Sequence, residues 1–108
     1  MNPQVLFICS RNQWRSRTAE EIFKNHPEVA VRSAGTSSTA RIRVNAKLLE
    51  WADTVFVMER AHKKILQARF PEILTEKEVL VLDIPDEYAF MDPELVEMLE
   101  GVMEEYLS

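Results

Sequence analysis

Four short apolar segments alternate with amphipathic segments along the chain, and this alternation constrains the fold more than any other feature. The apolar segments are residues 5–8, 29–31, 54–58 and 79–82, each of a length typical of a strand buried on both faces of a parallel sheet. Residues 33–36 are rich in turn formers and are expected to end the second strand. The pattern predicts an α/β fold with three layers, α/β/α, a four-stranded parallel sheet, and a single domain over residues 1–108.

Capping and breaking residues mark the ends of the expected helices. The first helix is expected over residues 16–26, and the third is expected to close at Pro71. Asn45 can cap the second helix, because its side-chain oxygen can accept a free backbone N–H group. The last helix has the clearest start, with Asp92 as N-cap and Pro93 at the first helical position.

The charges are distributed unevenly. Up to Leu82 the chain has 13 basic and 9 acidic residues, and from Asp83 onward it has 9 acidic residues and no basic one. Most of the acidic run falls on the last helix, where we expect a solvated face. An arginine-rich first half within a chain of net charge −5 favours a local anion site over a nucleic-acid surface. Arginines that are merely scattered and solvated fit the same composition.

Composition also bounds the location and the cofactors. The chain has no apolar run near the roughly 20 residues that a membrane span needs, and residues 1–4 lack the basic start of a signal peptide. Its one cysteine can form neither an internal disulfide nor a thiolate zinc site. We therefore expect a cytoplasmic protein without a membrane partner, a nucleic-acid partner, a metal or another cofactor.

The two histidines and the two tryptophans receive structural interpretations. His26 and His62 are expected at the surface, the first at a helix end and the second beside two lysines. Trp14 and Trp51 are expected to pack in the core or between a helix and the sheet.

The loop after the first strand carries the strongest chemical signal. Ligands of parallel sheets bind at the carboxyl ends of the strands, and here residues 9–16 have the form C-x5-R-S between a strand and a helix. A loop around a helix N-terminus directs several N–H groups at one point, which suits a tetrahedral anion and favours a thiolate at Cys9. Arg15 offers two parallel donors to phosphoryl oxygens, Ser16 can hydrogen-bond the sulfur, and Asn12 tolerates a left-handed backbone. The alternative is that Cys9 is only a small buried apolar residue.

Four motifs, in order along nearly the whole chain, resemble those of the low-molecular-weight protein tyrosine phosphatases. They are Cys9 to Ser16 followed by Arg17-Thr18-Ala19-Glu20, then Ser33-Ala34-Gly35-Thr36, then Ala52-Asp53 through Met58-Glu59, and last Asp86-Glu87-Tyr88. The resemblance implies a phosphotyrosine phosphatase I-like fold. It also implies hydrolysis of a phosphomonoester, either a phosphotyrosyl protein or a small aryl or alkyl phosphoester, without a cofactor.

The resemblance further implies roles for individual residues. Cys9 would be the nucleophile that forms a phosphocysteine, and Asp86 would be the general acid and base. Arg15 would hold the phosphoryl oxygens, and Ser33 would support the loop through Asn12. The residues expected to contact substrate or phosphate are Ser10, Arg11, Asn12, Gln13, Trp14, Arg15, Ser16 and Tyr88.

Three departures from the family pattern affect these expectations. The chain is short between Thr36 and Ala52, the part that supplies an aromatic wall of the substrate pocket in the family. Trp14 stands where a second loop cysteine is usual, and Glu87 replaces the proline of the acid loop. The family's substrate preference therefore does not transfer, and Asp83 and Glu87 remain alternatives to Asp86.

Three other functions share parts of this pattern. An arsenate reductase of the same fold uses the anion loop but typically needs further cysteines, which this chain lacks. A cysteine phosphotransfer domain has a phosphorylated cysteine after the first strand but does not need Arg15. A non-catalytic module that binds phosphate or a phosphoprotein would keep the loop without turnover.

Overall fold

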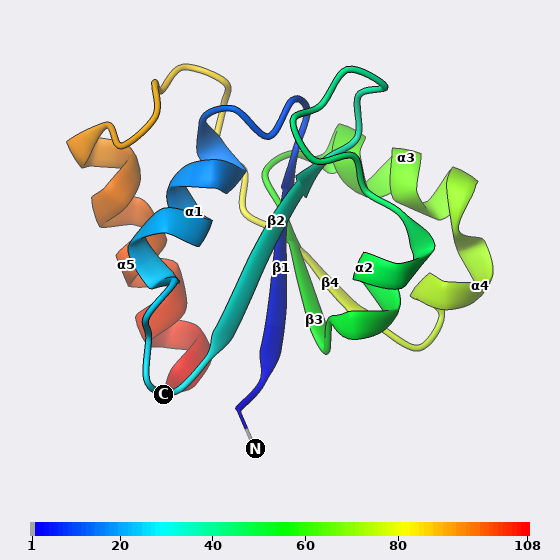
Figure 1. Ribbon diagram of the computed structural model, residues 1–108, viewed down its shortest axis with the longest axis horizontal. Coiled ribbons are helices and arrows are strands. Elements are labelled where there is room, and N and C mark those ends of the chain that lie inside the picture. Colours follow the sequence, from blue (N-terminus) through cyan, green and yellow to red (C-terminus); the bar gives the residue numbers. More distant parts are fainter. Residues whose placement is uncertain (1) are drawn as a thin grey trace.

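The computed structural model describes residues 2–108, which form one four-stranded parallel sheet flanked by helices (Figure 1). The strands lie in the order β2-β1-β3-β4. The elements follow one another as β1 (Gln4–Cys9), α1 (Arg15–Phe23), β2 (Ala30–Gly35), α2 (Ala46–Trp51), β3 (Thr54–Val57), α3 (Arg60–Arg69), α4 (Pro71–Leu74), β4 (Glu78–Val81) and α5 (Pro93–Leu107). The expected three-layer α/β/α architecture is confirmed.

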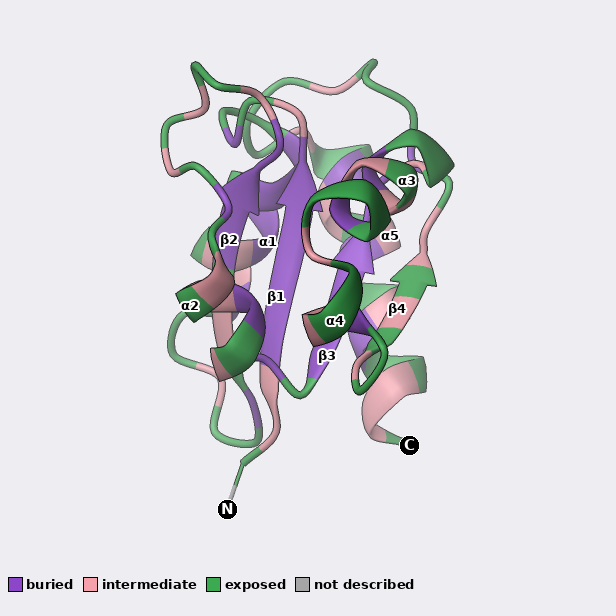
Figure 2. Cartoon of the chain, turned by 90° about the vertical axis from the view of Figure 1, so that its right-hand side faces the viewer, coloured by how far each residue is buried: buried purple, intermediate pink, exposed green. Residues whose placement is uncertain are grey.

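Side chains of β1 alternate between two apolar cores. Val5 and Phe7 face the layer of α1 and α5, whereas Leu6 and Ile8 face the layer of α2, α3 and α4. The strand is buried over most of its length and lies in the middle of the sheet (Figure 2). Full burial of an aliphatic or phenyl side chain contributes about 1.5–3 kcal/mol. The run of apolar residues at the start of the sequence therefore anchors both layers.

Two capping predictions are confirmed by hydrogen bonds. The side chain of Asn45 accepts the N–H group of Leu48 at 2.8 Å, at the start of α2. The side chain of Asp92 accepts the N–H group of Glu94 at 2.9 Å, with Pro93 as the first residue of α5.

One local prediction is wrong, and another is confirmed with an addition. Residues 33–35 continue β2 instead of forming a turn, because they pair in parallel register with residues 7–9 of β1, and this ladder outweighs the turn propensity of serine and glycine. The third helix closes before Pro71 as expected, since α3 ends at Arg69. Pro71 itself begins the short helix α4, because its fixed φ and missing N–H group suit the first helical position.

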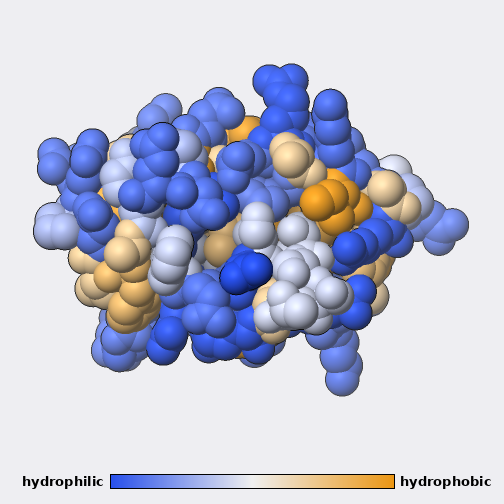
Figure 3. Space-filling model, turned by 90° about the horizontal axis from the view of Figure 1, so that it is seen from above, coloured by the Kyte–Doolittle hydropathy of each residue, from blue (hydrophilic) through white to orange (hydrophobic). Residues whose placement is uncertain are grey.

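The topology brings the loops after β1, β3 and β4 to one edge of the sheet, at the top of Figure 1. The chain moves from β1 to β2 on one side of β1 and later to β3 on its other side, so the strand order reverses at β1. Parallel sheets bind ligands at such a point, beyond the carboxyl ends of the strands. Seen from above, this edge of the molecule is mostly hydrophilic (Figure 3).

None of the helices within residues 2–108 is both long and apolar enough to cross a membrane.

Gly35 ends β2 where the chain passes close to the loop after β1. A Cβ atom at Gly35 would lie 2.5 Å from the carbonyl oxygen of Ser10 and 2.7 Å from the Cβ atom of Ala40. Gly35→Ala should therefore lower the free energy of unfolding by about 1–3 kcal/mol, as overpacking does, measured by urea denaturation.

Gly101 in α5 is the matched control, since its Cβ atom would meet nothing within 4 Å. Gly101→Ala should raise stability by about 0.5–1 kcal/mol through helix propensity. An unchanged denaturation midpoint for Gly35→Ala would mean that β2 and the loop are not in close contact.

Candidate active site

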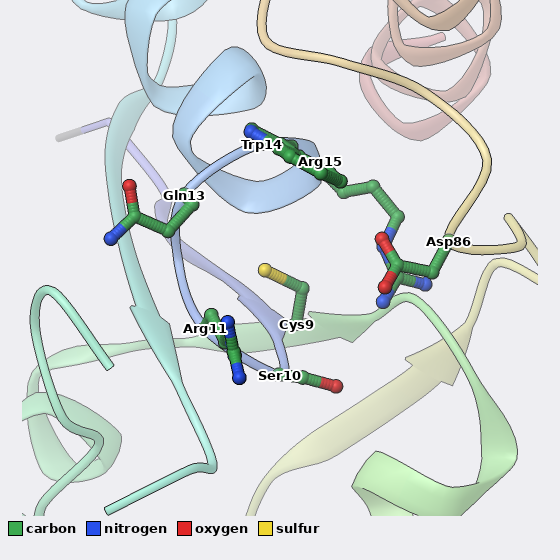
Figure 4. A pocket seen from close by; sticks show the side chains of 7 residues that line it. All are labelled: Cys9, Ser10, Arg11, Gln13, Trp14, Arg15 and Asp86. Carbon is green, nitrogen blue, oxygen red and sulfur yellow. The ribbon is translucent and has the colours of Figure 1, made fainter. Parts of the chain in front are cut away.

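A cavity of about 540 Å³ opens at the carboxyl end of β1. Six of its lining residues come from the end of β1, the following loop and the first residue of α1, and the seventh comes from the loop after β4 (Figure 4). These residues are Cys9, Ser10, Arg11, Gln13, Trp14, Arg15 and Asp86. The cavity therefore lies where the C-x5-R-S motif predicts an anion site.

The backbone carbonyl groups of the loop are held by donors outside it. The N–H groups of Thr36 and Ser37 donate to the carbonyl oxygens of Cys9 and Ser10, at 3.0 and 2.9 Å. Arg41 binds two more: its N–H group donates to the carbonyl of Arg11 at 2.9 Å, and its Nε donates to that of Asn12 at 3.1 Å. Four consecutive carbonyl groups are thus drawn toward the segment after β2.

This arrangement turns the N–H groups of the loop inward. In a trans peptide the carbonyl of one residue and the N–H of the next point in opposite directions, and every peptide bond described is trans. The N–H groups of residues 10–13 therefore point away from the segment after β2. That of Asn12 donates to the Cys9 sulfur at 3.3 Å. A ring of inward N–H groups at the start of α1 is suited to an anion.

A chain of buried polar side chains supports the sulfur from behind. The Ser16 hydroxyl lies 2.9 Å from the sulfur of Cys9, and the amide of Asn12 donates to Ser16 at 2.7 Å and to Ser33 at 2.9 Å. When Cys9 is a thiolate it has no proton, so Ser16 donates to it. The expected contact between Asn12 and Ser33 is present, and Ser33 donates onward to Glu20 at 2.7 Å.

Asn12 adopts the left-handed backbone that its place in the loop requires, with φ of 58°. Asparagine accepts this conformation more readily than most residues. Because Asn12 and Ser16 are buried behind the loop, they shape the cavity without lining it.

Arg15 is buried and fixed by three acceptors. Its Nη1 lies 2.6 Å from Glu59 Oε2 and 2.7 Å from the carbonyl oxygen of Ile84, and its Nε lies 3.6 Å from Asp86 Oδ1. A buried charge needs such partners to offset the loss of hydration. Since Glu59 and Ile84 both bind Nη1, the Nε–Nη2 edge is the part of the guanidinium that can serve a bound anion, and Asp86 borders this edge at Nε.

The acidic residues after β4 differ in their positions. Asp86 is the only one of Asp83, Asp86, Glu87 and Asp92 among the residues lining the cavity. Asp92 is occupied as the N-cap of α5, and Asp83 has a left-handed backbone, with φ of 55°, just beyond β4. Of the four carboxylates, Asp86 is therefore the one placed beside Arg15 and the loop.

Three expectations from the sequence differ from the structure. His62 is only 3% exposed, because α3 lies against the loop and the Nε2 of His62 contacts the Ser10 hydroxyl. Trp14 is 49% exposed at the cavity instead of packed in the core, since the residue before α1 lies on the surface of the loop. Tyr88 packs against the core beneath α5 and is not among the residues that line the cavity. Trp51 is half-buried against the other core, as expected.

The sequence contains a weak signal for His62. Glu59 and His62 have the spacing of a helix N-cap and its third helical residue, and His62 Nδ1 accepts the N–H group of Glu59 at 3.0 Å. Nothing in the sequence indicates that the outer nitrogen of this ring reaches the loop after β1. Within residues 2–108, no group of three or more His, Cys, Asp or Glu side chains has the geometry of a metal site.

Comparisons with known proteins agree with this geometry. A family model described as low molecular weight phosphotyrosine protein phosphatase matches residues 4–50. The structure is similar to that of a YwlE mutant from Bacillus subtilis, with a TM-score of 0.74 and 23% identity over 99% of this chain and 100% of that one. No curated protein matches the sequence.

Two further structures have the same fold. The tyrosine phosphatase Wzb from Escherichia coli K30, in complex with phosphate, has a TM-score of 0.76 and 21% identity over 98% of this chain and 96% of that one. The YwlE arginine phosphatase from Geobacillus stearothermophilus has a TM-score of 0.72 and 21% identity over 97% of this chain and 93% of that one.

Two substitutions at Asn12 separate its backbone role from its side-chain role. Asn12→Gly removes the amide that binds Ser16 and Ser33 and should cost about 1–3 kcal/mol of unfolding free energy. Asn12→Ala removes the same amide and also places a Cβ-bearing aliphatic residue at positive φ, so it should cost roughly 1 kcal/mol more. Urea denaturation measures both.

The exposed Asn25 is the matched control, and there the glycine variant should be no more stable than the alanine variant. Equal stability of the two Asn12 variants would contradict the left-handed backbone at this position.

Proposed function

We propose that this chain is a member of the low-molecular-weight protein tyrosine phosphatase family, whose model matches residues 4–50, and that it hydrolyses phosphomonoesters through a phosphocysteine at Cys9. The observation that carries the proposal is the environment of the Cys9 sulfur. The N–H group of Asn12 donates to this sulfur, and the hydroxyl of Ser16, which can donate to a thiolate, lies 2.9 Å from it; Cys9 and Arg15 line the same cavity. This is the environment that a nucleophilic thiolate needs.

In the first step the thiolate attacks phosphorus, so that an S–P bond forms as the P–O bond to the leaving group breaks. Asp86 gives its proton to the departing oxygen. The inward N–H groups of the loop and the Nε–Nη2 edge of Arg15 hold the three equatorial oxygens, where charge is spread in the transition state.

In the second step water attacks phosphorus and the S–P bond breaks, which returns the thiolate and releases inorganic phosphate. Asp86 takes a proton from the attacking water and is ready for the next cycle. The hydrogen bond from Ser16 stabilises the sulfur as it leaves with its negative charge. The residues of the chain supply every group in these two steps, and no cofactor takes part.

The substrate we propose is a phosphotyrosyl protein or a small aryl or alkyl phosphoester, acted on in the cytoplasm. The cavity is lined by the loop after β1 and by Asp86, and no lining residue lies between Thr36 and Ala52. The exposed ring of Trp14 is the aromatic surface at this cavity. Because both a tyrosine phosphatase and an arginine phosphatase have this fold, phosphotyrosine and phosphoarginine should be assayed side by side.

Cys9→Ser tests the nucleophile. Hydrolysis of p-nitrophenyl phosphate should fall to the level of the assay without enzyme, because a serine hydroxyl lacks the nucleophilicity of a thiolate. Affinity for vanadate should survive in part, since Arg15 and the loop N–H groups remain. Isothermal titration calorimetry measures this affinity, and retained vanadate binding shows that the variant is folded.

Activity of Cys9→Ser near that of the wild type would contradict the proposed mechanism. In the wild-type protein, a phosphocysteine that persists without hydrolysis would identify a phosphotransfer domain instead. Binding of vanadate without any turnover would identify a non-catalytic module.

Asp86→Asn tests the general acid. Protonation matters most for a basic leaving group, so this variant should slow phenyl phosphate much more than p-nitrophenyl phosphate, by about 10²-fold against less than about tenfold. Steady-state kcat values for the two esters measure the difference. Asp83→Asn and Glu87→Gln are the matched controls and should slow both esters little. Equal slowing of both esters by Asp86→Asn would contradict the role of Asp86 as general acid. Selective slowing of phenyl phosphate by one of the control variants would assign this role to the control residue instead.

A further inference from the structure

His62 connects helix α3 to the loop after β1. Its Nε2 lies 2.9 Å from the hydroxyl oxygen of Ser10, and its Nδ1 accepts the backbone N–H group of Glu59 at 3.0 Å. The ring is 3% exposed, so these two contacts replace water. The proposed mechanism leaves this buried titratable group without a role.

The contact with Glu59 determines which nitrogen of the ring carries the proton. A backbone N–H group can only donate, so Nδ1 is the unprotonated acceptor and the neutral ring bears its hydrogen on Nε2. A charged ring would place an Nδ1–H group against the N–H group of Glu59. Burial and the positive charge of Arg15 lower the pKa of His62, while Glu59 and Asp86 act in the opposite direction. His62 is therefore neutral and donates to Ser10.

The direction of this bond orients the Ser10 hydroxyl. Its oxygen accepts from His62, and so its own hydrogen must point elsewhere. Among the hydrogen bonds of residues 2–108, none gives this hydroxyl another partner. Ser10 lines the cavity with Cys9, Arg15 and Asp86, and Figure 4 shows its oxygen on the opposite side of Ser10 from Arg11.

We propose that Ser10 donates its hydroxyl hydrogen to an oxygen of the bound phosphoryl group, and that His62 is the positioning residue that fixes this donor. The proposal rests on the phosphatase function given above and adds a side-chain donor to the N–H groups of the loop. A donor that is oriented before binding needs no reorganisation when charge develops on the oxygen. His62 acts through Ser10 and does not touch the substrate.

The two nitrogens of His62 can be tested separately. His62→Gln keeps an N–H donor near the position of Nε2, whereas His62→Asn keeps only an acceptor near the position of Nδ1. Calorimetric titration with inorganic phosphate reports the donor without requiring turnover. Ser10→Ala and His62→Asn should each weaken phosphate binding by about tenfold, as expected for a hydrogen bond to a charged group. His62→Gln and Ser10→Thr should stay within about threefold of the wild type.

A double-mutant cycle separates positioning from a general structural effect. In the Ser10→Ala background, His62→Asn should weaken phosphate binding no further, because the hydroxyl that it orients is gone. His26→Asn is the matched control and should leave affinity unchanged. His26 Nδ1 accepts the N–H group of Glu28 at 3.0 Å, the same kind of local bond, and His26 does not line the cavity.

The proposal is overturned if Ser10→Ala binds phosphate like the wild type, or if His62→Gln loses as much affinity as His62→Asn. Losses that multiply in the double variant also overturn it. Because Ser10 is a partly exposed loop residue, its variants keep the test valid even if a His62 variant unfolds. Should the protein bind phosphate with this pattern but hydrolyse no ester, the proposed function fails and the Ser10–His62 assignment stands.

Discussion

The hydrogen bonds that draw the carbonyl groups of the β1–α1 loop outward are the constraint on which the site depends. Their donors, Thr36, Ser37 and Arg41, follow β2, so the loop takes its shape only when β2 has paired with β1. Gly35 allows the two segments to approach closely enough for these bonds. The inward N–H groups, the contact of Asn12 with the sulfur and the start of α1 all follow from this one arrangement. The sheet thus shapes the proposed anion site through backbone pairing.

Arg15 links this loop to the other two loops at the same edge of the sheet. Its Nη1 binds Glu59 after β3 and the carbonyl oxygen of Ile84 after β4, so that the Nε–Nη2 edge faces Asp86 and the cavity. Asp86, two residues beyond Ile84, is thereby held beside the cavity. An acidic chain of net charge −5 in this way presents a local cationic site, and the position of Asp86, the proposed general acid, depends on the same arginine.

The sequence predicts the sheet, the caps at Asn45 and Asp92 and the anion loop because each depends on local patterns: apolar runs, capping side chains and the spacing of Cys9 and Arg15. It does not predict burial of His62 or exposure of Trp14, because these depend on where α3 and the loop meet in three dimensions. The same holds for the end of β2, where pairing with β1 outweighs local turn propensity. The roles of Asp86, Ser10 and His62 in catalysis stay predictions.

The most direct test of the account is detection of the phosphocysteine itself. The protein is mixed with p-nitrophenyl phosphate, quenched with acid within the first turnovers, digested and analysed by mass spectrometry. The account predicts one phosphoryl group on the peptide that contains Cys9, and it predicts that this group appears and decays fast enough to support steady-state hydrolysis. Hydrolysis that proceeds without a phosphoryl group on Cys9, or with the group on another residue, would contradict it.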